Sequence, residues 1–142
     1  MMPNGEERTR MRFANGSATV ITRSPSWEPN DDDELPWQEA HYHAAMTEVY
    51  TLLRGWAQFI WLNPKVGVSR LDSPGTTLTF QPGVPHLVLL GPGAEIATLL
   101  FGLGVPNYDR NNNDWWPAPE SFFTVIKSEK AVAEKVARAS FK

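Results

Sequence analysis

Three histidines and one glutamate carry the clearest chemical potential of this chain. His41 and His43 are two residues apart, Glu48 follows five residues later, and His86 is the remaining histidine. In a β-strand, residues two apart point to the same face, so His41 and His43 can project together into a barrel interior. Three neutral imidazole nitrogens and one carboxylate form a donor set for a divalent first-row metal, and octahedral coordination would leave positions for water or a substrate.

The absence of cysteine narrows this chemistry. Because the chain has no cysteine, a disulfide framework, a zinc-finger site, thiol catalysis and an iron–sulfur cluster are excluded. Any metal must be held by His, Asp or Glu. A short turn at residues 44–46 would lead into a strand that begins near Glu48 and aims its carboxylate at the imidazoles. The sequence predicts a site for Fe, Mn, Ni, Co or Zn. Its predicted ligands are His41, His43, Glu48 and His86.

Short strands are predicted to position these side chains. Twelve prolines and ten glycines divide the middle of the chain into segments rich in Val, Ile, Leu, Thr, Phe or Trp. Turn signals spaced by roughly 8–12 residues are typical of an all-β sandwich or barrel. We expect strands at 18–22, 39–43, 47–53, 58–62, 76–80, 86–90 and 96–101. Arg54-Gly55 is predicted to make a tight hairpin with a positive φ at Gly55, and 63–64, 73–75 and 91–93 are further breaks.

The period of apolar residues changes near the end of the sequence. Ser128 can cap a helix that runs through Arg138, with Val132, Val136 and Ala139 on one face. We expect this helix to be a lid or a dimer contact.

Two other segments read as loops. The acidic run at 28–34 is typical of a solvated loop more often than of a cation site. The segment 107–119 is also predicted to be a loop, which Trp115 and Trp116 anchor to the barrel or to a second subunit.

Size and charge limit the classes of protein. A chain of 142 residues and 15.9 kDa is predicted to be one domain. The formal net charge of -3 does not suggest a nucleic-acid surface. Residues 1–12 lack the apolar region of a signal peptide, and apolar stretches such as 84–90 are too short to span a membrane. We therefore expect a soluble cytoplasmic protein that binds neither nucleic acid nor membrane.

The spacing of the histidines resembles the first motif of the cupin superfamily. That motif is written G-x5-H-x-H-x3,4-E-x6-G, and the chain matches it at His41, His43, Glu48 and Gly55, with Leu35 in place of the leading glycine. None of the predicted metal ligands is lost by this departure.

A second cupin motif, G-x5-P-x-G-x2-H-x3-N, is matched at Gly75, Gly83 and His86, while Gln81 and Leu90 replace its proline and asparagine. The resemblance covers about 39–101 and implies a small jelly-roll β-barrel there. Together with the predicted helix, we expect an all-β, single-domain jelly-roll β-barrel with a short C-terminal helix, an N-terminal arm at 1–38 and a C-terminal loop and helix at 107–142. A barrel that keeps these residues for internal hydrogen bonding, or that has lost its metal, is the alternative.

The lining of the pocket is predicted to be largely apolar. Strand alternation turns Tyr50, Leu52, Val88 and Leu90 inward. Tyr50 is the candidate catalytic acid, base or hydrogen-bond donor, although an inward tyrosine is more often a core residue. No cluster of inward Arg and Lys is visible in the sequence, which argues against a highly charged phosphosugar as substrate.

For two tryptophans and one arginine outside this lining, the sequence leaves two locations or roles possible. Trp56 and Trp61 are predicted to lie in the core or in a dimer interface. Arg54 is a solvated turn residue or a carboxylate ligand at the barrel mouth.

Two functions remain open because one fold hosts many chemistries. The first is a metal-dependent enzyme that acts on a small organic substrate as a dioxygenase, an isomerase or a lyase. The alternative is a non-catalytic cupin that binds or senses a small ligand. A purely structural partner-binding protein ranks last. The resemblance also implies a homodimer, because cupins commonly pair through barrel edges.

Overall fold

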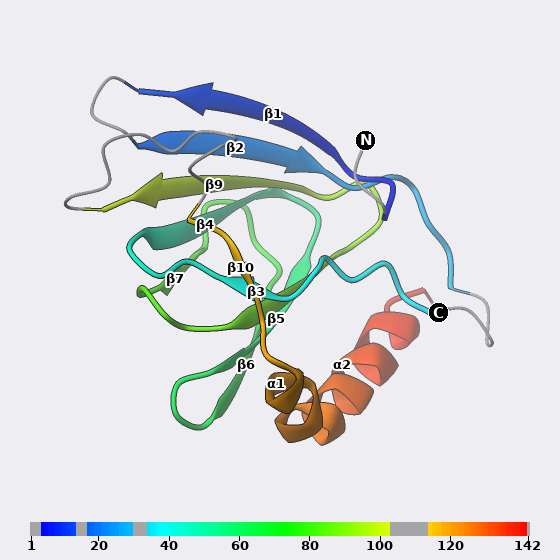
Figure 1. The fold of residues 1–142 in the computed structure, drawn as a ribbon. Helices are drawn as coiled ribbons and strands as arrows, with labels where there is room; N and C mark the ends of the chain where they lie inside the picture. Colours follow the sequence, from blue (N-terminus) through cyan, green and yellow to red (C-terminus); the bar gives the residue numbers. More distant parts are fainter. Residues whose placement is uncertain (1–3, 14–16, 30–33, 103–113, 142) are drawn as a thin grey trace.

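The computed structural model describes residues 4–13, 17–29, 34–102 and 114–141. Within these residues the chain forms two five-stranded antiparallel sheets that face each other, followed by two helices near the C-terminus (Figure 1). The first sheet consists, in spatial order, of β1 (Glu7–Arg12), β2 (Ala18–Arg23), β9 (Glu95–Phe101), β4 (Thr47–Arg54) and β7 (Thr77–Phe80). The second consists of β10 (Trp116–Pro117), β3 (His41–Tyr42), β8 (His86–Leu90), β5 (Ala57–Leu62) and β6 (Val66–Leu71).

The main apolar core lies between the two sheets. Burial alternates along β4, so that Glu48, Tyr50 and Leu52 are buried. Val88 and Leu90 of β8, each 1% exposed, belong to the same cluster as Tyr50 and Leu52. Burying a side chain of this size contributes about 1.5–3 kcal/mol, so the cluster fixes which face of β4 turns inward. The predicted inward orientation of these four apolar and aromatic residues is confirmed.

Most predicted strands agree with the structure. Six of the seven coincide with β2, β4, β5, β7, β8 and β9 to within one residue at each end, while the predicted strand at 39–43 is reduced to β3. The prediction lacks β1, β6 and β10. All six residues of β1 are exposed, so its sequence has no apolar alternation to reveal it. Strand β6 contains Gly67, where an added Cβ would lie 2.1 Å from the Trp61 ring.

The turn at Gly55 has the predicted conformation but a different role. Gly55 has a φ of +82°, yet β4 pairs with β7 and β9 whereas β5 pairs with β6 and β8. The predicted hairpin is therefore wrong, and Gly55 instead carries the chain from one sheet to the other. A Cβ at Gly55 would approach Ala94 to 2.9 Å, which is a second reason for glycine here.

The C-terminal helix has the predicted limits but presents a different face to the protein. Helix α1 (Glu120–Val125) and helix α2 (Lys127–Ala139) follow each other, with Ile126 rather than Ser128 at the N-cap of α2. Ala133 and Ala137 are buried, whereas Val132 and Val136 are 59% and 46% exposed, so the predicted face is wrong. One residue turns a helix by roughly 100°, and the small alanines let the helix approach the sheet closely.

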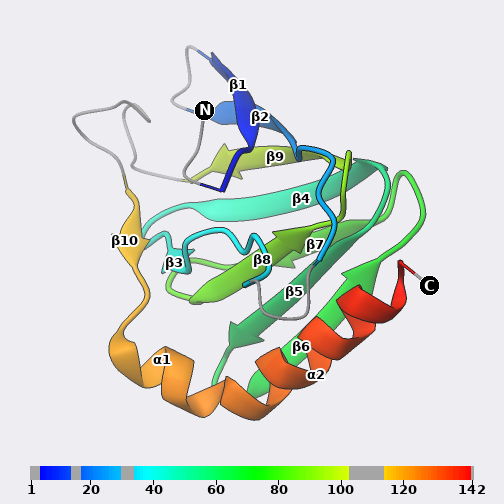
Figure 2. The same ribbon diagram turned by 90° about the vertical axis from the view of Figure 1, so that its right-hand side faces the viewer.

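Both helices cover the outer face of the second sheet (Figure 2). Ala133 and Phe122 pack on Ile60 of β5 and Leu87 of β8, and the Gln58 Nε2–H donates a 2.8 Å hydrogen bond to the Ala133 carbonyl. This face is turned away from the histidines, so the expectation of a lid is wrong. Among the described helices, none has the length and apolarity needed to span a membrane.

Candidate metal centre

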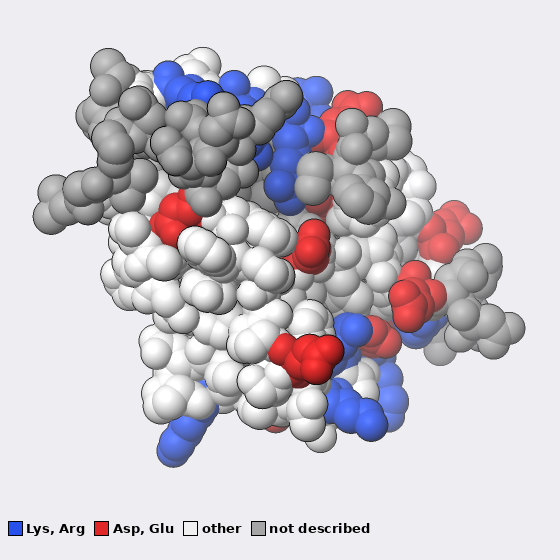
Figure 3. Space-filling view, viewed as in Figure 1, with Lys and Arg blue, Asp and Glu red and all other residues white. Residues whose placement is uncertain are grey.

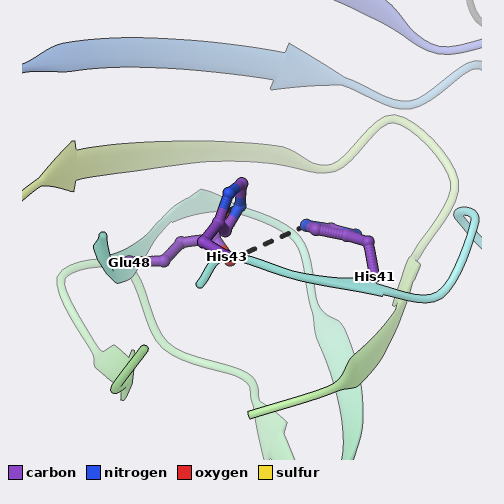
Figure 4. A group of neighbouring side chains, drawn as sticks. All are labelled: His41, His43 and Glu48. Atoms are coloured by element: carbon purple, nitrogen blue, oxygen red, sulfur yellow. Dashed lines mark ion pairs between the residues drawn. The ribbon is translucent and has the colours of Figure 1, made fainter. Parts of the chain in front are cut away.

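The structure brings the four predicted ligands together between the sheets. His41 on β3 lies directly opposite His86 on β8, His43 follows β3, and Glu48 extends from β4 on the facing sheet. Figure 4 shows the Glu48 carboxylate and the imidazoles of His41 and His43 converging on one point. Each of the four residues is at most 7% exposed. The structure therefore brings these four residues together, although His43 lies beyond the end of β3 and not within a strand as predicted.

The distances between their side-chain atoms are short. His41 Nε2 lies 3.8 Å from Glu48 Oε1, and His86 Nε2 lies 2.6 Å from the same oxygen. His43 Nε2 lies 3.3 Å from Glu48 Oε2. Ligand atoms of His41, His43 and Glu48 all lie within 4.8 Å of one another. One ion can contact all three of these residues, with His86 adjacent.

The other ring nitrogen of each histidine is bonded to the backbone. His41 Nδ1 lies 3.0 Å from the Glu39 carbonyl and His86 Nδ1 lies 2.9 Å from the Val84 carbonyl. His43 Nδ1 contacts the Asp114 carbonyl. Because a carbonyl can only accept, Nδ1–H is the donor and Nε2 of the neutral ring keeps its lone pair. Metal-ligating histidines are commonly oriented in this way.

Electrostatics favour the ligand forms of Glu48 and His41. Burial opposes ionisation of Glu48, but the surrounding imidazoles hold its pKa well below the usual range. Burial, aided by His86 and His43, lowers the pKa of His41. Burial also opposes charge on His43, yet Glu48 and Asp114 outweigh it and raise its pKa. An anionic carboxylate beside a neutral imidazole is the state that binds a cation.

Within the part of the chain that the structure describes, two buried polar atoms of this cluster have no hydrogen-bond partner and could be satisfied by a cation. Among the described residues, His43 Nε2 and Glu48 Oε1 are buried without a hydrogen-bond partner. In a neutral His86 that donates its Nδ1–H to the Val84 carbonyl, Nε2 can only accept a hydrogen bond. Glu48 Oε1, which lies 2.6 Å from this Nε2, is also an acceptor. The two atoms repel each other unless a proton or a cation lies between them. An unsatisfied buried polar group costs about 1–3 kcal/mol. The residues therefore fit a divalent first-row metal.

Known structures share this architecture. No protein-family model and no curated protein sequence matches the chain. An uncharacterized conserved protein with a double-stranded β-helix domain from Klebsiella pneumoniae superposes with a TM-score of 0.57 at 19% identity, over 83% of each chain. KdgF from Halomonas sp. superposes with a TM-score of 0.54 at 16% identity, over 70% of this chain and 81% of its own. Oxalate decarboxylase from Bacillus subtilis superposes with a TM-score of 0.60 at 15% identity, over 89% of this chain and 32% of its own. This chain has the cupin fold. It spans about a third of the oxalate decarboxylase chain.

Asp114 supports the candidate metal centre and is missing from the sequence-based predictions. Its carboxylate accepts backbone N–H bonds from Ala44 at 2.8 Å, Ala45 at 2.6 Å and Met46 at 3.0 Å. These bonds hold the turn between His43 and β4. Partial burial opposes its charge, but the N–H donors lower the pKa of Asp114. The available signal was an acidic residue directly before Trp115-Trp116 in a loop.

The predicted tryptophans have two roles: one stacks on the site and the others pack in the core. Trp115 stacks on His41 with ring centroids 5.5 Å apart, which confirms that this end of the predicted loop is anchored. Residues 107–113 of that loop, like 30–33 of the acidic run, lie outside the described residues. Trp61 packs against the core cluster and Trp56 against Trp27, in agreement with the core interpretation.

Tyr50 lies beside the cluster. Its side chain is buried, and its hydroxyl oxygen is 3.3 Å from His86 Nε2. Burial and the Glu48 charge raise its pKa well above the ordinary value. The phenol therefore keeps its proton at neutral pH and can donate a hydrogen bond.

The prediction that no inward arginines are present is wrong. Arg8 and Arg10 of β1 line the cavity that opens on His41, His43 and Glu48. Their alternate spacing was the signal, but β1 was not predicted as a strand. Arg54, in contrast, is an exposed surface residue 3.2 Å from Glu95.

Proposed function

We propose that this chain is a metal-dependent cupin enzyme that acts on a small organic substrate. The observation that carries the proposal is the set of three histidines whose Nδ1 atoms bond to carbonyls, so that their Nε2 atoms face the Glu48 carboxylate. Structural neighbours support it, since the Bacillus subtilis oxalate decarboxylase has Mn(II) centres. The proposed ligands are His41, His43, Glu48 and His86.

The described residues define what the protein contributes. When bound, a divalent ion of Fe, Mn, Ni, Co or Zn supplies Lewis-acid or redox chemistry. The carbonyl bonds to Nδ1 fix the orientation of each imidazole, and Asp114 fixes the turn that follows His43. The apolar cluster beneath the site excludes water and strengthens electrostatic interactions. Dioxygenase, isomerase and lyase reactions all fit this set of groups.

Tyr50 is the proposed catalytic residue. Its protonated hydroxyl lies at the edge of the cluster, 3.3 Å from His86 Nε2. From there it can donate a hydrogen bond, or a proton, to a substrate oxygen. Its raised pKa makes it a poor base at neutral pH, so the donor role is preferred over the base role.

Metal binding tests the proposal. Protein purified without chelator is analysed for metal and then loaded with Mn, Fe, Ni, Co or Zn, alongside a His86→Ala variant. Val88→Ala is the matched control, because Val88 is an equally buried inward residue on the same strand. We expect about one ion per chain in the wild type and the control, and a loss of at least tenfold in affinity in His86→Ala. A wild type that cannot be loaded would refute the enzyme proposal.

One observation favours the alternative of a metal-free cupin that binds or senses a small ligand. The 2.6 Å contact between His86 Nε2 and Glu48 Oε1 has the length of a strong hydrogen bond and would suit a proton in place of an ion. The metal-loading experiment separates the two functions. A chain that stays metal-free but binds small molecules would be a binding protein.

We also propose that the chain is one domain, residues 1–142, that works as a homodimer. The outer face of the first sheet carries an uncharged row across all five strands, formed by Met11, Thr19, Leu99, Val49 and Thr79. Met11 and Leu99 are 61% and 40% exposed. An exposed uncharged row with apolar residues of this kind suits a two-fold interface.

Sedimentation equilibrium tests the dimer. A Leu99→Asp substitution places a charge at the centre of the row and should yield monomers. Val68→Asp is the control, because Val68 is also exposed but lies on β6 of the other sheet. A wild-type monomer at all concentrations, or equal dissociation in both variants, would contradict this interface.

A further inference from the structure

Strand β1 directs two arginines towards the candidate metal centre. β1 pairs with β2 in a register that sets Arg8 opposite Thr22 and Arg10 opposite Val20. Directly opposed residues of an antiparallel pair point to the same face of the sheet. Val20 and Thr22 are 5% and 3% exposed and face the interior. Both guanidinium groups therefore project from the edge strand over the inner face of the sheet, where they line the same cavity as Glu48.

This cavity adjoins a larger cleft. The inner cavity, of about 40 Å³, is bordered by the arginines and the histidine–glutamate cluster. The adjoining cleft, of about 500 Å³, shares Arg8, Gln38, His41 and Trp115 with it. A volume of this size is within the usual range for small-molecule sites. Arg8 thus lines both the outer cleft and the inner cavity that contains the cluster.

Arg8 is held by an ion pair and is only partly solvated. The Arg8 side chain is 26% exposed, and its Nη2 lies 3.8 Å from the buried Glu6 carboxylate. Glu6 in turn accepts a 3.0 Å hydrogen bond from Gln38 Nε2. Figure 3 shows Lys and Arg atoms gathered along β1, with acidic residues scattered over the face below it. Restricting a guanidinium before binding lowers the entropy that a ligand must offset.

The charges around the cavity suit an anion once a cation is present. Arg8 and Arg10 balance the carboxylates of Glu6 and Glu48. Glu6, Glu34 and Glu39 all line the outer cleft, and of these Glu6 is the partner of Arg8 and is counted with the inner region for that reason. A divalent ion at the histidines would leave the inner region with an excess of two positive charges. The planar fork of a guanidinium matches the two oxygens of a carboxylate.

We propose that Arg8 and Arg10 form a carboxylate-recognition site and that the substrate is a small carboxylic acid. This inference rests on the proposed function, because it assigns the substrate class of the same centre. The substrate carboxylate pairs with the arginines while the reacting part of the molecule lies towards His41 and Glu48. A carboxylate suits the site better than a phosphate, because each carboxylate group carries one charge, whereas a phosphate places nearly two charges on a single group close to the Glu6 and Glu48 carboxylates.

Calorimetric titration tests the site with malonate as the probe, its neutral diamide as the uncharged analogue and inorganic phosphate as the competing oxyanion. Each is titrated into metal-free and Mn-loaded protein. We expect malonate to bind, the diamide to bind at least tenfold more weakly, and Arg8→Gln and Arg10→Gln each to weaken malonate binding about tenfold. Arg8→Lys, which keeps the charge but loses the fork, should recover part of the affinity.

Arg12→Gln is the matched control. Arg12 is on the same strand and, opposite Ala18, on the same face, but the inner cavity is lined by Arg8 and Arg10 instead. All three positions are on an exposed edge strand, and Arg8→Gln keeps a hydrogen-bond donor for the buried Glu6 carboxylate, so folding should change little, as a melting curve will show. The control should change malonate affinity less than twofold.

Three outcomes would overturn the inference. These are no malonate binding to the wild type, equal affinities in the Arg8, Arg10 and Arg12 variants, or arginine-dependent binding of phosphate that is tighter than that of malonate. The metal content of the same samples separates this inference from the proposed function. Metal-free protein that still binds malonate through Arg8 would retain the anion site while the enzyme proposal fails. Metal-loaded protein whose malonate affinity is unchanged in Arg8→Gln would retain the enzyme proposal while the anion site fails.

Discussion

Removal of the Asp114 carboxylate should loosen the metal centre although Asp114 is not one of its proposed ligands. In Asp114→Ala, three backbone N–H groups of the turn at 44–46 lose their acceptor. A hydrogen bond to a charged group contributes about 1.5–3 kcal/mol when it is buried. Two of these bonds are exposed and water can replace them, so we expect a loss of about 2 kcal/mol for the set.

That loss has two measurable consequences. For a chain of this size, about 2 kcal/mol lowers Tm by roughly 4–8 °C. Because the turn connects His43 to the strand that carries Glu48, we also expect metal affinity to fall by about 10- to 100-fold, as for other supporting groups. Competition with a fluorescent chelator measures this affinity. The main-chain carbonyl that His43 Nδ1 contacts is retained in the variant.

Asp72→Ala is the control for removal of an acidic side chain. The Asp72 carboxylate forms an exposed ion pair, 2.8 Å from Arg70 Nε, whose loss should change stability by less than about 1 kcal/mol. Asp114→Asn keeps one carbonyl oxygen and should be intermediate. If Asp114→Ala matches Asp72→Ala in both Tm and metal affinity, the reasoning that the turn positions the ligands is refuted.

Three further substitutions test the core, the pocket and the site. Tyr50→Phe keeps the aromatic packing but removes the hydroxyl that lies 3.3 Å from His86 Nε2. It should bind metal like the wild type, while kcat on a carboxylate substrate falls about 100-fold; a metal loss as large as that of His86→Ala would show a purely supporting role. Burial raises the pKa of Glu6 above 4.5, against the opposing effects of Arg8 and Asn4. The unfolded chain therefore ionises first, and the wild type loses stability as pH rises from 4.5 through the raised pKa. The free energy of unfolding of Glu6→Gln relative to wild type should increase over that window in urea titrations, and a decrease would contradict the assignment. Gly67→Ala places a Cβ 2.1 Å from the Trp61 ring and should destabilise the protein by about 1–3 kcal/mol in chemical denaturation. Ser69→Ala on the same strand should change stability by less than about 0.5 kcal/mol, and equal effects would disprove the clash.

The sequence was sufficient for the parts of the molecule where apolar periodicity and burial act together. Along β4, alternate residues are buried, so the period of two predicted both the strand and the inward direction of Glu48 and Tyr50. The His41–His86 pairing across β3 and β8 was not visible in the pattern. It depends on which strands become neighbours, and that is decided by packing across the whole core.

Elsewhere the same reliance on periodicity failed for identifiable physical reasons. Helix α2 has apolar residues on more than one face, and the face with Ala133 is buried because small side chains permit close contact with β5. Gly55 has the positive φ expected of it, but a single turn residue cannot specify whether the next strand pairs with the last one or crosses to the other sheet. These decisions are made by tertiary contacts.

The missed arginines and the missed strand β1 have one cause. β1 is an edge strand whose six residues are all exposed, so its sequence carries no apolar alternation, and the direction of Arg8 and Arg10 is set only by their register against β2. Because side chains alternate with a period of two, a slip of one residue would turn both guanidinium groups away from the cavity. The backbone bond from Phe13 N–H to the Ser17 carbonyl, at 2.8 Å, closes the β1–β2 connection and helps to fix that register. The pairing that the sequence could not reveal is thus the feature on which the proposed substrate recognition depends.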